Sequence, residues 1–437
     1  MSPVRQPASS IAHRTTLRPP APPGDGAASP DQAEYLAEEK FIVVTYISPS
    51  HLGTGTWFYA FGAGRGPAGN EGYCHLRCPR LRPTDKAWTP RAVVTEFACK
   101  AVVQLPVSCP ANKTTSELLR MPPTRFLPNF RTPCWYEALP KDADPNVNPY
   151  GHNLYACFSE GVRRDALDMA SVWLARSRTE RDPKRLRCLP YFYIAGMPKS
   201  GSTDLFRKVT LHPDVVRPPM KEPHYWSRNR FGMKLNYSSL IPLSDYVDLF
   251  DKAALQIEER TVSSGDVADA GTTQDSSTVY HHVITGDASA STFWGNDNWW
   301  RLPENCGRTE PLFTNAHYIR RLTPDARIIV IIRNPTERLY SDYLYFQKTN
   351  KSVSHFHQEV LLSIEKFKAC EAVHSLRTCL YDIHVANGVR LRIGLYHVYV
   401  EEWLKVFPAE QVLIIRTEDY AANLKLSVRR VYRFLGL

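Results

Sequence analysis

The chain has 437 residues, of which 43% are hydrophobic and 22% charged. Such a chain can bury the core of one large globular domain of ~250 residues with a smaller attachment, which excludes collagen, a coiled coil and disorder throughout. Lys and Arg outnumber Asp and Glu by 54 to 44, a net charge of +10. We therefore expect an anionic partner: nucleic acid, a phosphorylated cofactor or an acidic glycan.

Cysteines and glycosylation sequons bear on the compartment. Ten cysteines, with Asn-x-Ser/Thr sequons at Asn112, Asn236 and Asn350, favour an oxidising, glycosylating compartment over the cytosol. Cys74-x3-Cys78 lacks a second pair at ligand spacing, so we expect disulfides or free thiols there and no metal site. No apolar stretch of ~18 residues and no signal-peptide pattern is visible, which conflicts with the secretory interpretation unless the true N-terminus is missing.

The composition predicts three parts in chain order. Residues 1–38 are rich in Pro, Ala and Ser and are predicted to be disordered. Residues 39–187 carry short apolar runs broken by Gly and Pro, with many of the cysteines, and are predicted to form an irregular cysteine-containing region. From 188 to 437, strand-length apolar runs alternate with amphipathic stretches, which predicts an α/β fold: a P-loop-type, doubly wound parallel sheet flanked by helices.

The elements of this last part follow from periodicity. Strands are predicted at 191–195, 280–285, 327–332 and 411–415. Helices are predicted at 203–211, 245–259, 311–322, 336–347, 355–369, 392–406 and 423–435. The Ser/Thr/Gly/Asp-rich segment 262–277 is predicted to be a surface insertion.

A phosphate-binding loop follows the first of these strands. Gly196-Met-Pro-Lys-Ser-Gly-Ser-Thr203 leads into a helix, and such a turn offers backbone N–H groups and the positive end of a helix dipole to a phosphate. The spacing nearly matches G-x4-G-K-[ST], but Ser202 stands where that motif has its lysine, and the lysine lies at Lys199. A kinase or an ordinary NTPase is therefore disfavoured.

The third predicted strand ends in Arg333 and leads to a helix start carrying Ser341. A magnesium nucleotide site would have a metal-binding Asp at the end of this strand. An arginine with a hydroxyl is instead a phosphate clamp without metal, because guanidinium forms paired hydrogen bonds to phosphate oxygens. Two plainer interpretations stay open: Pro198-Lys-Ser-Gly-Ser202 as an ordinary turn, and Arg333 paired with a surface carboxylate.

Together the two loops resemble the 5′-phosphosulfate and 3′-phosphate elements of sulfotransferases that use 3′-phosphoadenosine 5′-phosphosulfate (PAPS). Five further stretches resemble the branch of Golgi carbohydrate sulfotransferases that act on N-acetylgalactosamine 4-sulfate at its 6-OH, over roughly 133–437. They are 133–137 (PCWYE), 187–190 (RCLP), 220–226 (MKEPHYW), 284–294 (ITGDASASTFW) and 338–346 (RLYSDYLYF).

The resemblance implies that the chain transfers a sulfuryl group from PAPS to a sulfated glycosaminoglycan of the chondroitin or dermatan type, in the Golgi lumen and without nucleic acid or metal. Members of that branch have an N-terminal membrane anchor and continue past the last residue here, so a C-terminally incomplete domain is expected. The alternative is a non-catalytic glycan-binding protein with a sulfotransferase fold.

The resemblance also assigns residues to the chemistry. Glu222 in Lys-Glu-Pro-His is the candidate general base, with the alternative that it only pairs with Lys221; His224 is a second candidate base. Lys199 is expected to stabilise charge on the bridging oxygen of the donor. Donors to the 5′-phosphate are expected from Ser200, Gly201, Ser202 and Thr203, and holders of the 3′-phosphate are Arg333 and Ser341.

Three further expectations are less specific. Acceptor contacts are expected from the basic cluster Lys221, Arg228, Arg230 and Lys234, unless it is a solvated face. Sugar or adenine stacking could come from Trp226, Trp294, Trp299 and Trp300, although large aromatic residues often form the core. The resemblance and the predicted chain reversal after 369 together predict a Cys370–Cys379 disulfide.

Overall fold

The computed structural model describes residues 125–141, 144, 148–150, 158–232, 240–263, 279–348, 351–382 and 388–437. It also describes the backbone of two antiparallel strands, β1 (Phe41–Tyr46) and β2 (Gly55–Ala60). The predicted disordered segment 1–38, the three sequons, Cys74, Cys78 and Lys234 lie outside these residues, as does most of the predicted insertion.

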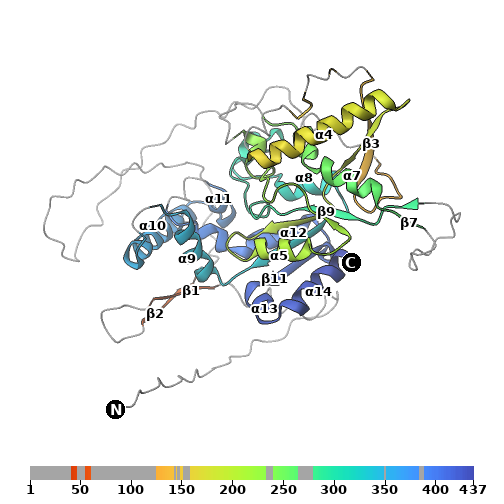
Figure 1. Ribbon diagram of the computed structural model, residues 1–437. Helices are drawn as coiled ribbons and strands as arrows, with labels where there is room; N and C mark the ends of the chain where they lie inside the picture. The colour runs from red at the N-terminus through yellow and green to blue at the C-terminus, as the bar shows by residue number, and fades with distance from the viewer. Residues whose placement is uncertain are drawn as a thin grey trace, which may run out of the picture.

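A five-stranded parallel sheet forms the centre of the molecule (Figure 1). Its order is β11-β10-β5-β9-β6, and every neighbouring pair is parallel. The strands are β5 (Phe192–Gly196), β6 (Val215–Val216), β9 (Ile284–Asp287), β10 (Arg327–Ile332) and β11 (Val412–Arg416). The predicted strands 191–195, 327–332 and 411–415 are confirmed to within a residue at each end.

The predicted strand 280–285 is wrong as a single element. Val279–Tyr280 forms β8, which pairs antiparallel with β7 (Val262–Ser263), whereas β9 begins only at Ile284. Between them His281 forms a separate bridge with Phe130 and its ring stacks on that residue at 3.8 Å between centroids. The change of partner at this point divides the apolar run into two strands.

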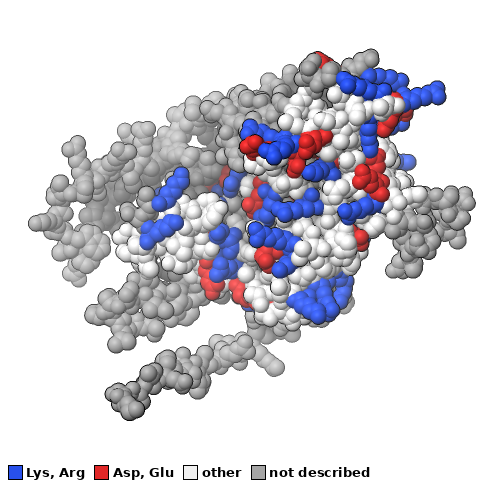
Figure 2. Space-filling model, in the orientation of Figure 1, with Lys and Arg blue, Asp and Glu red and all other residues white. Residues whose placement is uncertain are grey.

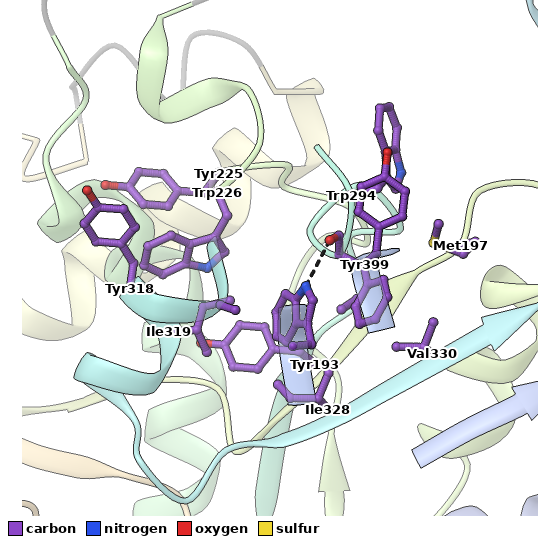
Figure 3. Packing of buried hydrophobic residues seen from close by; sticks show 14 of the residues in the cluster. Tyr193, Met197, Tyr225, Trp226, Trp294, Tyr318, Ile319, Ile328, Val330 and Tyr399 are labelled. Carbon is purple, nitrogen blue, oxygen red and sulfur yellow. Dashed lines mark hydrogen bonds between the residues drawn. The ribbon is translucent and has the colours of Figure 1, made fainter. Parts of the chain in front are cut away.

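Helices cover both faces of the sheet, which confirms the predicted doubly wound α/β fold. Alternate residues of β5 point to opposite faces. Phe192 and Ile194 pack with buried residues of α5 (Ser202–Val209) and α14 (Leu424–Leu435). Tyr193 and Ala195 join the larger cluster on the other face, with α8 (Asn315–Leu322) and α12 (Tyr396–Val406), part of which Figure 3 shows.

The remaining predicted helices are present with shifted ends. Helix 245–259 is broken by a 3-10 turn at 248–250 into α6 (Leu243–Val247) and α7 (Asp251–Glu259). Helix 311–322 begins only at Asn315, because Thr314 and His317 form a reciprocal capping box there. Further along the chain lie α9 (Pro335–Phe346), α10 (Val353–Glu371), α11 (Leu376–Tyr381) and α13 (Thr417–Ala422).

An additional layer precedes the sheet in sequence and packs beside it. β3 (Cys134–Ala138) and β4 (Lys184–Cys188) form an antiparallel pair, joined by a Cys134–Cys188 disulfide. The 20-residue α4 (Glu160–Thr179), which the sequence did not predict, packs on α7 and β4. The predicted boundary between 187 and 188 therefore falls inside a strand that packs against the sheet domain.

The Cys370–Cys379 disulfide is confirmed, with Cα atoms 5.8 Å apart, and it ties the end of α10 to α11. Within the described ranges, no helix is long and apolar enough to cross a membrane. Those ranges also hold no group of three or more His, Cys, Asp or Glu side chains placed to bind a metal ion.

Candidate functional site

The loop after β5 has the backbone geometry that its sequence predicts. Gly201 is the N-cap of α5 and has a φ of +96°, a left-handed conformation that favours glycine. No side chain caps this helix, so its first N–H groups point into the loop. Thr417 Oγ1 donates to the carbonyl oxygens of Ser200, at 2.6 Å, and Ile332, at 2.8 Å, which ties the loop to the end of β10.

The hydroxyl residues of the loop differ in accessibility. Thr203 is exposed in the first turn of α5, and Ser202 is buried there. Ser200 is fully buried, and its Oγ has no hydrogen-bond partner in the part of the chain that the structure describes. Buried hydroxyls normally have a partner, so Ser200 is a donor available to a group held by the loop.

Arg333 and Ser341, the predicted phosphate clamp, lie just after β10 and within α9. Arg333 follows β10, whose neighbour β5 enters the phosphate loop, and Ser341 lies in α9, half-buried. In this state Arg333 pairs with Glu337, with Nη2 2.9 Å and Nε 3.2 Å from Oε2. Arg333 therefore pairs with a carboxylate, which is the alternative that the sequence left open. A ligand phosphate would have to displace Glu337.

Lys199 links the phosphate loop to the same helix. Its Nζ lies 3.9 Å from the ring centroid of Tyr345, which is 67% exposed. Tyr345 is four residues after Ser341 in α9, so the two side chains share one face of the helix. The loop lysine and the clamp hydroxyl therefore lie on the same side of the site, a proximity that only the folded chain reveals.

Glu222 lies in the segment that follows β6 and pairs with Lys221, Nζ to Oε1 at 2.6 Å. Its other oxygen, Oε2, is 3.9 Å from His224 Nε2. The side chain of Glu222 is 36% exposed, whereas that of His224 is 18% exposed. The pairing with Lys221 is therefore present, and the second carboxylate oxygen faces the other candidate base.

Serines after β9 hold His224 in place. Ser289 Oγ accepts the backbone N–H of His224 at 3.0 Å, and Ser291 Oγ lies 2.7 Å from His224 Nδ1. Ser291 also contacts Ser227 Oγ at 2.5 Å. The stretch 284–294 supported the family resemblance, but no role for its serines followed from sequence. Their contacts span more than 60 residues, and nothing local indicates them.

The candidate catalytic residues share an unusual backbone conformation. Among the described residues, three other than glycine have a positive φ: Lys199 at +64°, Glu222 at +62° and His224 at +49°. A left-handed conformation is costly for a residue with a side chain and often occurs at functional sites. These are the three residues to which the family resemblance assigns catalytic roles, and those roles stay a prediction.

The basic cluster separates into three kinds of residue. Arg230 is buried, donates to Asn315 Oδ1 at 2.8 Å and lies over the ring of Phe231, so its predicted acceptor role is wrong. Lys221 pairs with Glu222. Arg228 is half-buried beside Glu222, and burial and the neighbouring Arg390 lower its pKa.

Two of the four tryptophans form the core. Trp226 and Trp294 are 1% and 3% exposed, and Figure 3 shows Trp226 packed with Tyr225 and Tyr318. Stacking of an open indole face on a ligand is therefore excluded for these two in this state. Trp299 is partly buried and Trp300 is 41% exposed, so a stacking role stays a prediction for them.

Charge is mixed over the face seen in Figure 2, where basic side chains alternate with acidic ones. The clearest basic group on this face lies over α14, whose exposed basic residues are Lys425, Arg429, Arg430 and Arg433. The positive net charge is thus not spread uniformly over this face.

Comparisons with known proteins show which proteins this chain resembles. A family model described as "Sulfotransferase domain" matches residues 301–437. The chain is 41% identical over 341 residues to carbohydrate sulfotransferase 15 of Homo sapiens, covering 76% of this chain and 59% of that protein. It is 26% identical over 251 residues to human heparan sulfate glucosamine 3-O-sulfotransferase 6, covering 57% of this chain and 53% of that protein.

A solved structure, a sulfotransferase from Alicyclobacillus acidocaldarius, matches with a TM-score of 0.37 and 23% identity, over 57% of this chain and 82% of that one. The chain spans little more than half the length of the curated relatives it matches.

Proposed function

Because this chain belongs to the carbohydrate sulfotransferase family, we propose that it transfers a sulfuryl group from PAPS to a hydroxyl of a sulfated glycosaminoglycan. The acceptor we propose is the 6-OH of N-acetylgalactosamine 4-sulfate in chondroitin or dermatan sulfate. The observation that carries the proposal is the positive φ shared by Lys199 in the phosphate loop and by Glu222 and His224 in the segment after β6. It supports a built reaction centre over a simple anion-binding surface.

Donor binding would use the loop and the clamp. The open N–H groups of α5, with Ser200, Ser202 and Thr203, would hold the 5′-phosphate. Arg333, released from Glu337, and Ser341 would hold the 3′-phosphate. This arrangement would select PAPS over ATP, which has no 3′-phosphate.

The transfer step would need a base and a cation. Glu222 would take the proton of the acceptor hydroxyl as its oxygen forms a bond to sulfur. The bond between sulfur and the bridging oxygen would break, and adenosine 3′,5′-bisphosphate would leave with its new charge next to the Lys199 ammonium. His224, held by Ser289 and Ser291, would keep the carboxylate oriented or serve as the base itself.

We propose the Golgi lumen as the compartment. The Cys134–Cys188 and Cys370–Cys379 disulfides support an oxidising environment. The family resemblance supports a membrane anchor as well.

One assay tests the proposed function. PAPS carrying ³⁵S-sulfate is incubated with the protein and with chondroitin that is either desulfated or 4-sulfated, and label in the polysaccharide is measured. Transfer that requires the 4-sulfated polymer is the expected result. Binding of the polymer without transfer would replace the proposal by the non-catalytic alternative, and transfer of phosphate from ATP would replace it by a kinase.

A further inference from the structure

Two buried serines contact the imidazole of His224 in a row. Ser291 Oγ lies 2.7 Å from His224 Nδ1, and Ser227 Oγ lies 2.5 Å from Ser291 Oγ. The other ring nitrogen, Nε2, lies 3.9 Å from Glu222 Oε2. The imidazole is therefore in contact with a pair of hydroxyl groups on one side and with a carboxylate on the other.

The protons along this row can point in either of two directions. In the first, the Ser227 hydroxyl donates to Ser291, and Ser291 donates to His224 Nδ1. The imidazole then carries its own proton on Nε2, toward Glu222. In the second, His224 Nδ1–H donates to Ser291, and Ser291 donates to Ser227. The lone pair of Nε2 then faces Glu222.

Two features of the row favour the first direction. Among the described residues Ser227 Oγ has no hydrogen-bond partner other than Ser291, and Ser227 is buried. In the second direction its proton would have no acceptor, and an unpaired buried donor costs ~1–3 kcal/mol. Glu222 adds to this, because a carboxylate attracts an N–H group and repels a lone pair. Both features place the proton of the imidazole on Nε2.

A third serine holds the backbone of His224 and not its ring. Ser289 Oγ accepts the backbone N–H of His224 at 3.0 Å, and the φ of His224 is +49°. Ser289 and Ser291 are both buried and belong to the same segment after β9. Ser289 therefore offers a matched control for Ser291.

We propose that Ser291 is a positioning residue that holds His224 as a neutral imidazole with its proton on Nε2, facing the carboxylate of Glu222. The inference rests on the proposed function, because it names how the same site prepares its base. The hydrogen bond made by one ring nitrogen determines which nitrogen carries the proton. In this state Nε2 is already protonated and the Nδ1 lone pair accepts from Ser291. His224 therefore orients the carboxylate, and Glu222 takes the proton of the acceptor hydroxyl.

Nitrogen-15 NMR of protein labelled in its histidines tests the position of the proton without turnover. Spectra are recorded at pH ~8, where free histidine is neutral, and His224→Gln identifies the two resonances of His224 by their absence. We expect Nδ1 to resonate as an unprotonated nitrogen and Nε2 as a protonated one. In Ser291→Ala the two tautomers should exchange, so the two resonances should move toward each other. Ser289→Ala should leave their separation unchanged.

Kinetics separate positioning from a purely structural role. Ser291→Ala should lower kcat for sulfuryl transfer by ~10-fold to ~100-fold, the scale of a misplaced catalytic group. Its affinity for adenosine 3′,5′-bisphosphate should stay within ~2-fold of the wild type. Ser291→Thr keeps the hydroxyl and should recover most of kcat. If the added methyl group unfolds Ser291→Thr, Ser227→Ala decides instead, since loss of the donor behind Ser291 should move both resonances in the same direction as Ser291→Ala.

Three NMR outcomes would overturn the inference. They are a wild type with the proton on Nδ1 or on both nitrogens, resonances that do not move in Ser291→Ala, and an equal movement in Ser289→Ala. The expected resonances in a protein that transfers no sulfuryl group would support the inference and refute the proposed function. Sulfuryl transfer by a protein with the proton on Nδ1 would do the reverse.

Discussion

Replacing Arg333 by alanine should weaken binding of adenosine 3′,5′-bisphosphate by ~2 kcal/mol, or ~30-fold. Hydrogen bonds to charged groups contribute ~1.5–3 kcal/mol each. The ion pair between Arg333 and Glu337, which the ligand must break, reduces this gain in binding free energy. The side chains of Arg333 and Glu337 are 31% and 61% exposed, and exposed ion pairs contribute ~0.2–1 kcal/mol. The cost of releasing Arg333 is therefore small compared with the gain.

The backbone around Arg333 should not move in this variant. Tyr396 donates to the carbonyl oxygen of Arg333 at 2.8 Å, and the N–H of Asn334 donates to Glu418 at 2.7 Å. Both contacts are independent of the Arg333 side chain. The effect should therefore be confined to the missing guanidinium and the freed Glu337 carboxylate.

The loss of nucleotide affinity in Arg333→Ala is measured by calorimetry, with two nucleotides and with a matched variant at Glu337. Adenosine 5′-monophosphate lacks the 3′-phosphate, so the affinity for it should fall by less than ~3-fold in Arg333→Ala. Glu337→Gln should bind the bisphosphate as well as or up to ~2-fold better than the wild type, since it frees Arg333. Equal losses for both nucleotides, or a loss of affinity in Glu337→Gln, would refute the clamp.

Three other changes test separate parts of the structure. Tyr345→Ala should bind adenosine 3′,5′-bisphosphate ~2-fold to 5-fold more tightly, because an exposed cation–π contact of ~0.5–1 kcal/mol no longer competes for the loop lysine; unchanged or weaker binding in calorimetry would count against this. Asp251→Asn should lower the free energy of unfolding in urea by ~3 kcal/mol, since Asp251 pairs with the fully buried Arg187 at 2.7 Å; a loss below ~1 kcal/mol would contradict that reasoning. Burial and a nearby arginine lower the pKa of His317 below its ordinary 6.5, so the folded state binds this proton less readily and stability is lost as pH falls through 6.5. His317→Gln keeps the capping box but not the titration, and should lose less stability than the wild type between pH 7.5 and pH 5 in urea unfolding; an equal loss would assign the acid sensitivity elsewhere.

Sequence predicted the elements with strong periodicity well. The run 327–332, buried from Ile328 to Ile331, could only be a strand inside a sheet covered on both faces. The phosphate loop could be located because its glycines and its place between a strand and a helix are local features. The same holds for the helices with an amphipathic pattern and a capping residue.

Two kinds of feature could not be predicted. Four arginines near the two ends of α4 obscured its apolar period, and β6 has only two residues. The contacts of His224 with Ser291 and of Lys199 with Tyr345 join segments far apart in the chain. Such contacts depend on the sheet order, which the sequence does not reveal.

The role of Glu222 in catalysis is tested most directly by Glu222→Gln, assayed for sulfuryl transfer from PAPS and, in parallel, for binding of adenosine 3′,5′-bisphosphate. Glutamine keeps the shape of the side chain but accepts no proton. We therefore predict a fall in kcat of at least ~100-fold, with donor affinity within a few fold of the wild type. His224→Ala, measured alongside, shows whether the imidazole is the base instead. Near-normal turnover of Glu222→Gln would contradict the assignment of Glu222 as the base.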